Sequence, residues 1–248
     1  EQFNRAGLGI SMGVGKTRIA INHLLKNYDV FIKVLVVVPK NSVKESWITE
    51  LNKMSLYDTL KDHIDFVTYL SLNKKDPNDY GIVYLDECHS LLYNHEKFLN
   101  GYTGKIVGLT GTPPKSEFTE KWKMVNKYCP IKYNFSVDNA TDSNILNDYK
   151  IIVHYLNLSK EKNIKKKTKN GGFWFASEAG DYEYCTNRVN DANTMKQKQL
   201  ASIMRMRGLM DYETKEKYAK RFLKTIDSKC IIFANTQKQA DRICSHSY

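Results

Sequence analysis

The chain has 248 residues, enough for two medium-sized domains, with no apolar run near the roughly 20 residues of a membrane span and no secretory signal at its start. Lys and Arg exceed Asp and Glu by 38 − 27 = 11, which favours a polyanionic partner such as nucleic acid, although a generally lysine-rich proteome gives the same balance. The five cysteines are scattered without a C-x-x-C pair, so we expect reduced thiols, a cytoplasmic and not a secreted protein, and no metal cluster.

A glycine-rich loop near the start of the chain gives the first indication of chemistry. Its two glycines precede Lys16 and Thr17 in a pattern that lets backbone N–H groups turn toward the phosphates of a nucleotide. The lysine then reaches the terminal phosphates, and the Thr17 hydroxyl ligates Mg²⁺. The strict pattern has glycine where this chain has Ile10, and a flexible loop with a chance lysine is the alternative. The residues expected at the nucleotide are Gly13, Val14, Gly15, Lys16, Thr17 and Arg18.

Apolar runs alternate with helical patterns through the first 115 residues. Residues 34–38 form an unalternating β-branched run, which is typical of a parallel strand covered on both faces. Further strands are expected at residues 66–69, 81–85 and 105–109. Trp47 lies in helical phase with Val43 and Leu51, which favours packing in the core over stacking on a base. This rhythm predicts a doubly wound α/β domain with functional residues at the carboxyl ends of its strands.

An acidic pair follows the third of these strands directly. Asp86 is suited to hold Mg²⁺ through water, and Glu87 to orient or deprotonate an attacking water. Isolated acidic pairs are more often solvated turns. Here the pair ends an apolar strand downstream of a phosphate loop, which makes the surface alternative the weaker one.

The motifs in this order resemble those of the superfamily 2 helicases and translocases, within the P-loop NTPases. Residues 13–17 resemble motif I, residues 86–89 a DExH-type motif II and residues 110–113 a T-G-T-P motif III. Residues 38–42 with Trp47 are similar to motif Ia of the Swi/Snf-like branch, and residues 231–236 to motif IV. The resemblance implies ATP and Mg²⁺ as cofactors and a RecA-like fold. It also implies residue roles: catalysis by Glu87, Lys16 and Asp86, with Thr17 and Asp86 at the metal; coupling through His89, Thr110 and Thr112; and nucleic-acid contacts by Pro39, Lys40, Thr68, Asn235 and Thr236.

The sequence pattern changes near residue 148. We expect residues 1–148 to form the first RecA-like domain and residues 149–248 the opening part of a second one, with a basic insert around 159–190. In the second part, strands are predicted at 151–158 and 230–234, a hairpin from 171–175 and 181–185, and helices from 195 to 226, broken near 208–212, and from 237. The lysine-rich run 160–169 is typical of a solvated loop. The alternative is a hairpin that contacts nucleic acid, with Phe173 and Trp174 beside the lysines.

The resemblance implies a monomeric, nucleic-acid-dependent ATPase that moves on nucleic acid, with DNA favoured over RNA. Two alternatives stay open: a translocase subunit that remodels protein–DNA complexes without unwinding, and a catalytically silent module with ATP as a structural ligand. The chain starts at Glu1 and its motifs end before the arginine-bearing motif VI, so we expect a piece of a longer protein that hydrolyses ATP weakly. The lysine- and asparagine-rich composition suits a phage or other virus, for which the location is the host cytoplasm.

Overall fold

A computed structural model describes residues 4–27, 32–168 and 170–244, and the chain divides into two units, Glu1–Lys150 and Ile151–Tyr248. Within these described ranges, none of the helices combines the length and the apolar character that crossing a membrane requires.

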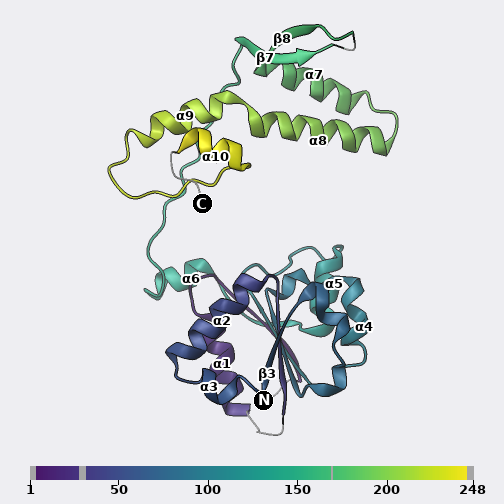
Figure 1. Cartoon of the computed structure of the whole chain (residues 1–248), viewed down its shortest axis with the longest axis vertical. Coiled ribbons are helices and arrows are strands. Elements are labelled where there is room, and N and C mark those ends of the chain that lie inside the picture. Colours follow the sequence, from purple (N-terminus) through teal and green to yellow (C-terminus); the bar gives the residue numbers. More distant parts are fainter. Residues whose placement is uncertain (1–3, 28–31, 169, 245–248) are drawn as a thin grey trace. The chain divides into compact units, whose positions relative to one another are not determined.

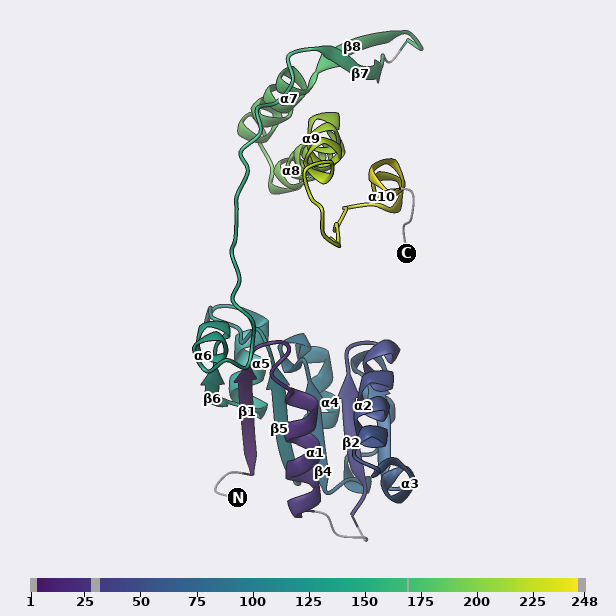
Figure 2. The same cartoon turned by 90° about the vertical axis from the view of Figure 1, so that its left-hand side faces the viewer.

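The first unit is built on one six-stranded parallel sheet (Figure 2). Its strand order is β3-β2-β4-β5-β1-β6, so that the first strand lies inside the sheet and the chain crosses over in both directions from it. This arrangement confirms the predicted doubly wound α/β fold of the first unit. The strands are β1 (Arg5–Ile10), β2 (Val34–Val38), β3 (Ile64–Thr68), β4 (Ile82–Asp86), β5 (Lys105–Thr110) and β6 (Ile131–Phe135).

Helices cover both faces of this sheet, as Figure 1 shows with the sheet seen nearly edge-on. One layer contains α1 (Lys16–Asn27), α2 (Asn41–Lys53) and α3 (Tyr57–Leu60), and the other contains α4 (Glu96–Leu99) and α5 (Glu120–Tyr128). The remaining elements of the unit are α6 (Val137–Asp142) and the short 3-10 helices η1 (Tyr69–Lys74), η2 (Pro77–Asp79), η3 (Cys88–Ser90) and η4 (Tyr93–His95).

The packing of strand β2, which lies between β3 and β4, explains why its sequence does not alternate. Val34, Val36 and Val38 face one helical layer and pack with Trp47 and Leu51 of α2, whereas Leu35 and Val37 face the other. All five strand residues are buried. Burying each of these side chains stabilises the fold by roughly 1.5–3 kcal/mol relative to leaving it in water.

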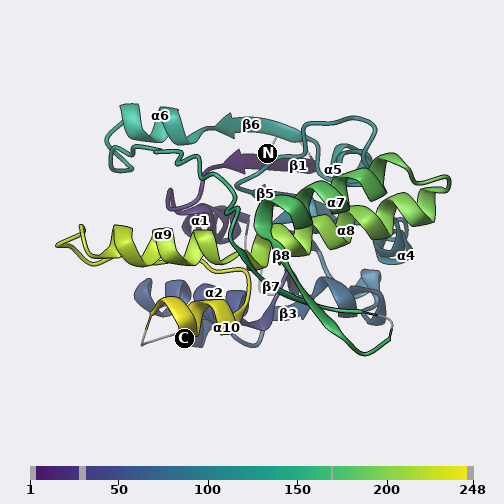
Figure 3. The ribbon, with the colours of Figure 1, turned by 90° about the horizontal axis from the view of Figure 1, so that it is seen from above.

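In its described residues, the second unit combines a two-stranded antiparallel hairpin with four helices. The hairpin joins β7 (Lys162–Lys167) to β8 (Phe173–Ser177), and Figure 3 shows α7 (Glu178–Asn190) and α8 (Met195–Asp211) running side by side. The predicted break in the long helical region is confirmed at Tyr212, which separates α8 from α9 (Glu213–Leu223). The last helix is α10 (Gln237–Ile243), where the sequence predicts one.

Three predicted strands of the second unit are wrong. Residues 181–185 lie in α7, because the Ser177 side chain caps this helix by accepting a hydrogen bond from Gly180 N (3.1 Å), and because Asp181, Cys185 and Val189 share its buried face. Residues 151–158 and 230–234 are apolar but form no strand. Their side chains are largely exposed, and within the described part of this unit only β7 and β8 pair, so that neither run has a strand to bond with.

The lysine-rich run is a strand and not a loop. Lys162–Lys167 forms β7, which pairs with β8 over most of its length, while Lys169 lies outside the described residues. The basic insert therefore presents an ordered hairpin.

Candidate nucleotide site

The residues that sequence analysis singled out in the first unit gather at one edge of the sheet. All six strands are parallel, so their carboxyl ends meet at the same edge. Strand β1 leads into the phosphate loop, β4 ends at Asp86 and β5 ends at Thr110. Pro39 and Lys40 directly follow β2, and Thr68 ends β3. Asn235 and Thr236 lie in the second unit, where the Thr236 side chain caps α10.

The loop between β1 and α1 has the backbone that cradling a phosphate requires. Gly13 and Gly15 adopt φ angles of 84° and 96°, in the left-handed region that glycine enters without strain. Lys16 is the first residue of α1, whose N-terminal N–H groups and dipole favour an anion. Among the described residues, the buried Ser11 Oγ has no hydrogen-bond partner. This orphaned hydroxyl beside an open glycine loop fits the phosphates of a nucleotide.

Asp86 is buried and held at three points. Its Oδ2 accepts a hydrogen bond from Trp47 Nε1 (2.8 Å), its Oδ1 accepts one from Glu87 N (3.0 Å), and its carbonyl oxygen accepts one from Tyr69 OH (2.8 Å). Trp47 itself is 1% exposed, which confirms that its indole packs in the core and does not stack on a base. Sequence reasoning missed the second task of Trp47, which is to orient the candidate metal-binding carboxylate, because no local pattern signals it.

Opposing influences act on the pKa of the Asp86 carboxylate. Burial raises the pKa of Asp86 above its usual value, and the negative charge of Glu87 raises it further. The hydrogen bond from Trp47 and the positive charge of Lys16 oppose the rise. A divalent cation favours the ionised form of any carboxylate that faces it, so the set fits Mg²⁺.

Glu87 faces the end of the phosphate loop. Its Oε1 lies 4.0 Å from Lys16 Nζ, and its Oε2 accepts a long hydrogen bond from Gly111 N (3.5 Å). The backbone of Glu87 is left-handed, with φ 49°, which turns the chain sharply away from β4. Both side chains of the Lys16–Glu87 pair are only partly exposed, at 11% and 20%.

His89 connects the acidic pair to the end of the neighbouring strand β5. Its Nδ1 lies 2.9 Å from Thr110 Oγ1, 3.3 Å from Thr112 Oγ1 and 3.3 Å from Glu87 Oε2. Thr112 N also donates to Thr110 Oγ1 (3.1 Å). Glu87, His89, Thr110 and Thr112 thus form one polar cluster, in which His89 suits both a coupling role and that of a hydrogen-bonded polar residue at a strand end.

Two cysteines pack directly behind the site. Cys88 and Cys129 are fully buried, and the contact with Cys129, together with burial, raises the pKa of the Cys88 thiol. Gly108 on β5 leaves them room, because a Cβ there would lie 2.7 Å from Cys129 Sγ. Cys88 therefore has a packing role.

The Arg18 side chain turns from the loop toward α2. It is 66% exposed, with its Nη1 3.9 Å from Glu50 Oε1. The Arg18 side chain is therefore directed at a carboxylate of α2, whereas the Lys16 side chain faces Glu87 beside the phosphate loop.

Residues 1–115 match the model of a protein family described as the type III restriction enzyme res subunit. No curated protein matches the chain at a significant level.

Several solved structures are similar to parts of the chain. The UvsW helicase from bacteriophage T4 matches 52% of this chain and 54% of its own at 17% identity, with a TM-score of 0.45. The Hef helicase domain of Pyrococcus furiosus matches 52% of this chain and 34% of its own at 16% identity, with a TM-score of 0.41. The type ISP restriction-modification enzyme LlaGI, in complex with a DNA substrate mimic, matches 97% of this chain and 27% of its own at 12% identity, with a TM-score of 0.45. The chain thus spans about half or less of the length of these proteins.

Proposed function

We propose that the first unit belongs to a superfamily 2 helicase or translocase, and that this chain binds ATP with Mg²⁺ at the carboxyl edge of the sheet and hydrolyses it to move on nucleic acid. The observation that supports the proposal most directly is the grouping of Lys16, Glu87 and Asp86 beside the phosphate loop, with Lys16 Nζ 4.0 Å from Glu87 Oε1. A positive charge, a candidate base and a metal-binding carboxylate are the groups that phosphoryl transfer to water needs.

Each of these residues has a proposed role. Lys16 would bind the terminal phosphates, and Thr17 through its hydroxyl and Asp86 through water would hold the metal. When bound, Mg²⁺ neutralises the charge that develops on the phosphates. Glu87 orients the attacking water and takes its proton. The contact between Glu87 and Gly111 N helps to keep the carboxylate directed at the loop.

The coupling to nucleic acid is proposed to run through the polar cluster of His89, Thr110 and Thr112. His89 contacts both Glu87 and the end of β5, so a change at the carboxylate can alter the position of residues 110–113. Pro39, Lys40 and Thr68 lie at the same edge of the sheet, and we propose that they contact the phosphates of the strand. Such contacts position nucleic acid without reading its sequence, as movement along it requires. Asn235 and Thr236 are proposed as the contacts of the second unit, and DNA is favoured over RNA.

A comparison of two variants tests this proposal. Glu87→Gln keeps the shape of the side chain and the charge of Lys16, so the variant is expected to bind ATP as tightly as the parent chain while ATP turnover falls by about 10²–10⁴-fold. Lys16→Ala is expected to lose ATP binding itself. Binding is measured with a fluorescent ATP analogue, and turnover with radiolabelled ATP in excess enzyme, with and without single- and double-stranded DNA.

Asp58→Asn serves as the matched control, because Asp58 is a carboxylate of the same unit whose side chain is 91% exposed. Equal turnover by the parent chain and Glu87→Gln would contradict the catalytic role of Glu87. ATP binding without any turnover in the parent chain would favour a silent module that uses ATP as a structural ligand.

A further inference from the structure

We propose that one face of the β7–β8 hairpin binds single-stranded nucleic acid by stacking bases on two phenylalanine rings. This stacking face consists of Lys162, Lys165, Phe173 and Phe175. The inference rests on the proposed function only in taking nucleic acid as the partner, and it concerns the second unit alone.

The strand register places these four residues on one side of the hairpin. Lys165 lies directly opposite Phe175, Lys167 opposite Phe173 and, beyond a register shift between Lys162 and Ile164, Lys162 opposite Ser177, so that Lys167 adds a third lysine to this side. Directly opposite residues of an antiparallel pair point to the same face, and so do residues two apart on one strand. Phe173 and Phe175 therefore share a face with these lysines, while Trp174 and Ala176 point to the other.

Both rings of the stacking face are accessible to a ligand. Phe173 is 57% exposed and Phe175 is 52% exposed. Lys165 Nζ lies over the Phe173 ring, 4.0 Å from its centroid, so that a cation is held directly beside an aromatic surface. Large apolar side chains that share an exposed face mark an interaction site more often than an accident of packing.

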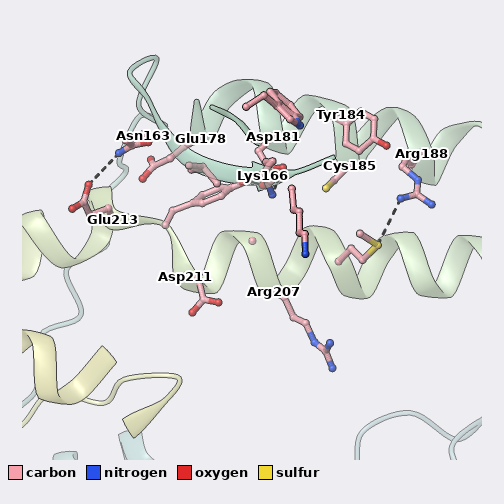
Figure 4. A pocket seen from close by; sticks show the side chains of 16 residues that line it. Asn163, Lys166, Glu178, Asp181, Tyr184, Cys185, Arg188, Arg207, Asp211 and Glu213 are labelled. Carbon is pink, nitrogen blue, oxygen red and sulfur yellow. Dashed lines mark hydrogen bonds and ion pairs between the residues drawn. The ribbon is translucent and has the colours of Figure 1, made fainter. Parts of the chain in front are cut away.

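The opposite face anchors the hairpin to the helices of its unit. It borders a pocket of about 820 Å³, shown in Figure 4, where Lys166 reaches Asp181 of α7. Lys166 Nζ lies 2.7 Å from Asp181 Oδ1, and Tyr212 OH donates to Asp181 Oδ2 (3.2 Å). Near the start of β7, Asn163 Nδ2 donates to Glu213 Oε2 (3.1 Å).

These anchors make the stacking face a fixed platform. On the anchored side, Ala176 is 6% exposed and Asp181 of α7, which pairs with Lys166, is 7% exposed, while Trp174 on the same side stays 52% exposed. A platform that is ordered before binding loses little conformational entropy when a ligand stacks on it.

Single-stranded nucleic acid fits this face better than a duplex or a protein segment. Phe173 and Phe175 are two positions apart on β8, so their backbone positions are separated by about 6.8 Å, twice the rise per residue of an antiparallel strand. Aromatic side chains on a sheet surface stack two or three unpaired bases in known RNA-binding modules, and lysines beside such rings follow the phosphates. The bases of a duplex are already stacked on one another and cannot reach the rings. An acidic protein partner would use the lysines but would not need two flat rings beside them.

Fluorescence anisotropy with labelled oligo-dT and oligo-rU, measured without nucleotide, tests the inference on the whole chain. Phe173→Ala is expected to weaken binding by about 5-fold or more, and Phe173→Ala/Phe175→Ala by about 25-fold or more, at the low end of what aromatic stacking on bases contributes. Phe173→Tyr/Phe175→Tyr keeps the flat rings and is expected to bind like the parent chain, which separates ring stacking from a folding defect.

The lysines give a second, independent readout. Lys162→Ala/Lys165→Ala is expected to lower the slope of log affinity against log salt by about 1.4, because each phosphate that a lysine neutralises on a single strand contributes about 0.7 to that slope. The exposed pair Lys196 and Lys198 of α8 serves as the charge-matched control, and Tyr155, which is 93% exposed in the same unit, as the aromatic control.

Three results would overturn the inference: unchanged single-strand affinity in the double phenylalanine variant, an equal loss of affinity for a blunt duplex of the same length, or an equal loss in the control variants. The outcome does not depend on the ATP site. Oligo-dT binding is measured without nucleotide, whereas the proposed function is tested by ATP binding and turnover, so a failure of ATP turnover and a failure of the stacking face are distinguishable.

Discussion

Replacing Trp47 by phenylalanine isolates one hydrogen bond beneath the candidate metal site. The substitution keeps an aromatic ring next to Tyr84 and Phe66, whose centroids lie 6.0 and 6.5 Å from that of Trp47. It removes the indole N–H that Asp86 Oδ2 accepts at 2.8 Å. The buried carboxylate then loses its strongest side-chain partner while its burial stays the same.

The expected loss of stability follows from this geometry. A hydrogen bond to a charged group contributes about 1.5–3 kcal/mol, and the smaller ring adds about 1 kcal/mol for poorer packing. A total of about 3 kcal/mol lowers the melting temperature of a unit of this size by about 6–12 °C. Because burial raises the pKa of Asp86, ionising this carboxylate destabilises the fold, and Trp47 reduces that cost. The penalty of Trp47→Phe is therefore largest near neutral pH, and it shrinks as the pH falls through the pKa of Asp86 and the carboxyl takes up a proton.

The assay compares the affinity for a fluorescent ATP analogue with and without Mg²⁺. Loss of an outer partner of a metal-binding carboxylate costs about 10-fold or more in metal-dependent affinity. Because the Trp47 hydrogen bond holds the pKa of Asp86 down, the pH below which Mg²⁺ no longer helps binding is expected to move upward in the variant. Trp122→Phe, which removes a half-buried indole on α5, is the matched control.

A folded Trp47→Phe variant with the Mg²⁺ dependence and pH profile of the parent chain would refute this reasoning. A loss of stability alone, with metal-dependent affinity unchanged, would assign Trp47 to core packing only.

Two further predictions concern the stability of the two units. Glu178→Ala is expected to destabilise the second unit by about 2–4 kcal/mol in urea unfolding followed by amide hydrogen exchange of α7, because Glu178 accepts hydrogen bonds from Ser159 N (3.0 Å), Thr214 N (3.0 Å) and Thr214 Oγ1 (2.6 Å). Burial alone raises the pKa of Glu178, but the hydrogen bonds, those from Thr214 foremost, outweigh burial and hold the pKa below its usual value. The stabilisation by ionised Glu178 is therefore present above the unfolded-state pKa and is lost as the pH falls through the folded-state pKa. Below that pH, the stabilities of the variant and the parent chain should converge. Gly108→Ala is expected to cost about 1–3 kcal/mol in thermal unfolding, because the new Cβ would lie 2.7 Å from Cys129 Sγ; an unchanged melting temperature contradicts this tight packing.

The first unit was predictable because its signals are local. The unalternating run 34–38 requires burial on both faces, and such a strand fits only a covered parallel sheet. Asp86 and Glu87 follow another such strand, so their place at the edge of the sheet comes from topology and not from side-chain detail. By contrast, Trp47 and Asp86 are 39 residues apart, and their hydrogen bond depends on how α2 packs over β4. The helical phase of Trp47 predicts burial but cannot say where its N–H points.

The second unit shows where apolar patterns mislead. Residues 230–234 look like a buried strand, but a strand also needs a neighbour for its backbone groups, and Ile231 and Phe233 are 83% and 93% exposed. Residues 181–185 alternate like a strand, yet the Ser177 cap and the spacing of the buried Asp181, Cys185 and Val189 follow a helix. The lysines of β7 looked like a loop because charge runs rarely form strands, and the cross-strand partners Trp174 and Phe175 reverse that expectation.

The left-handed backbone of Glu87 has a consequence for any attempt to make this protein more robust. An L-residue at φ 49° costs roughly 1–2 kcal/mol that glycine does not. Substitutions chosen for thermostability alone would therefore converge on glycine at position 87 and remove the carboxylate that faces Lys16. Thermal stability and the proposed catalytic role thus require different residues at position 87. Engineered variants should therefore keep Glu87 and raise stability by substitutions at other positions.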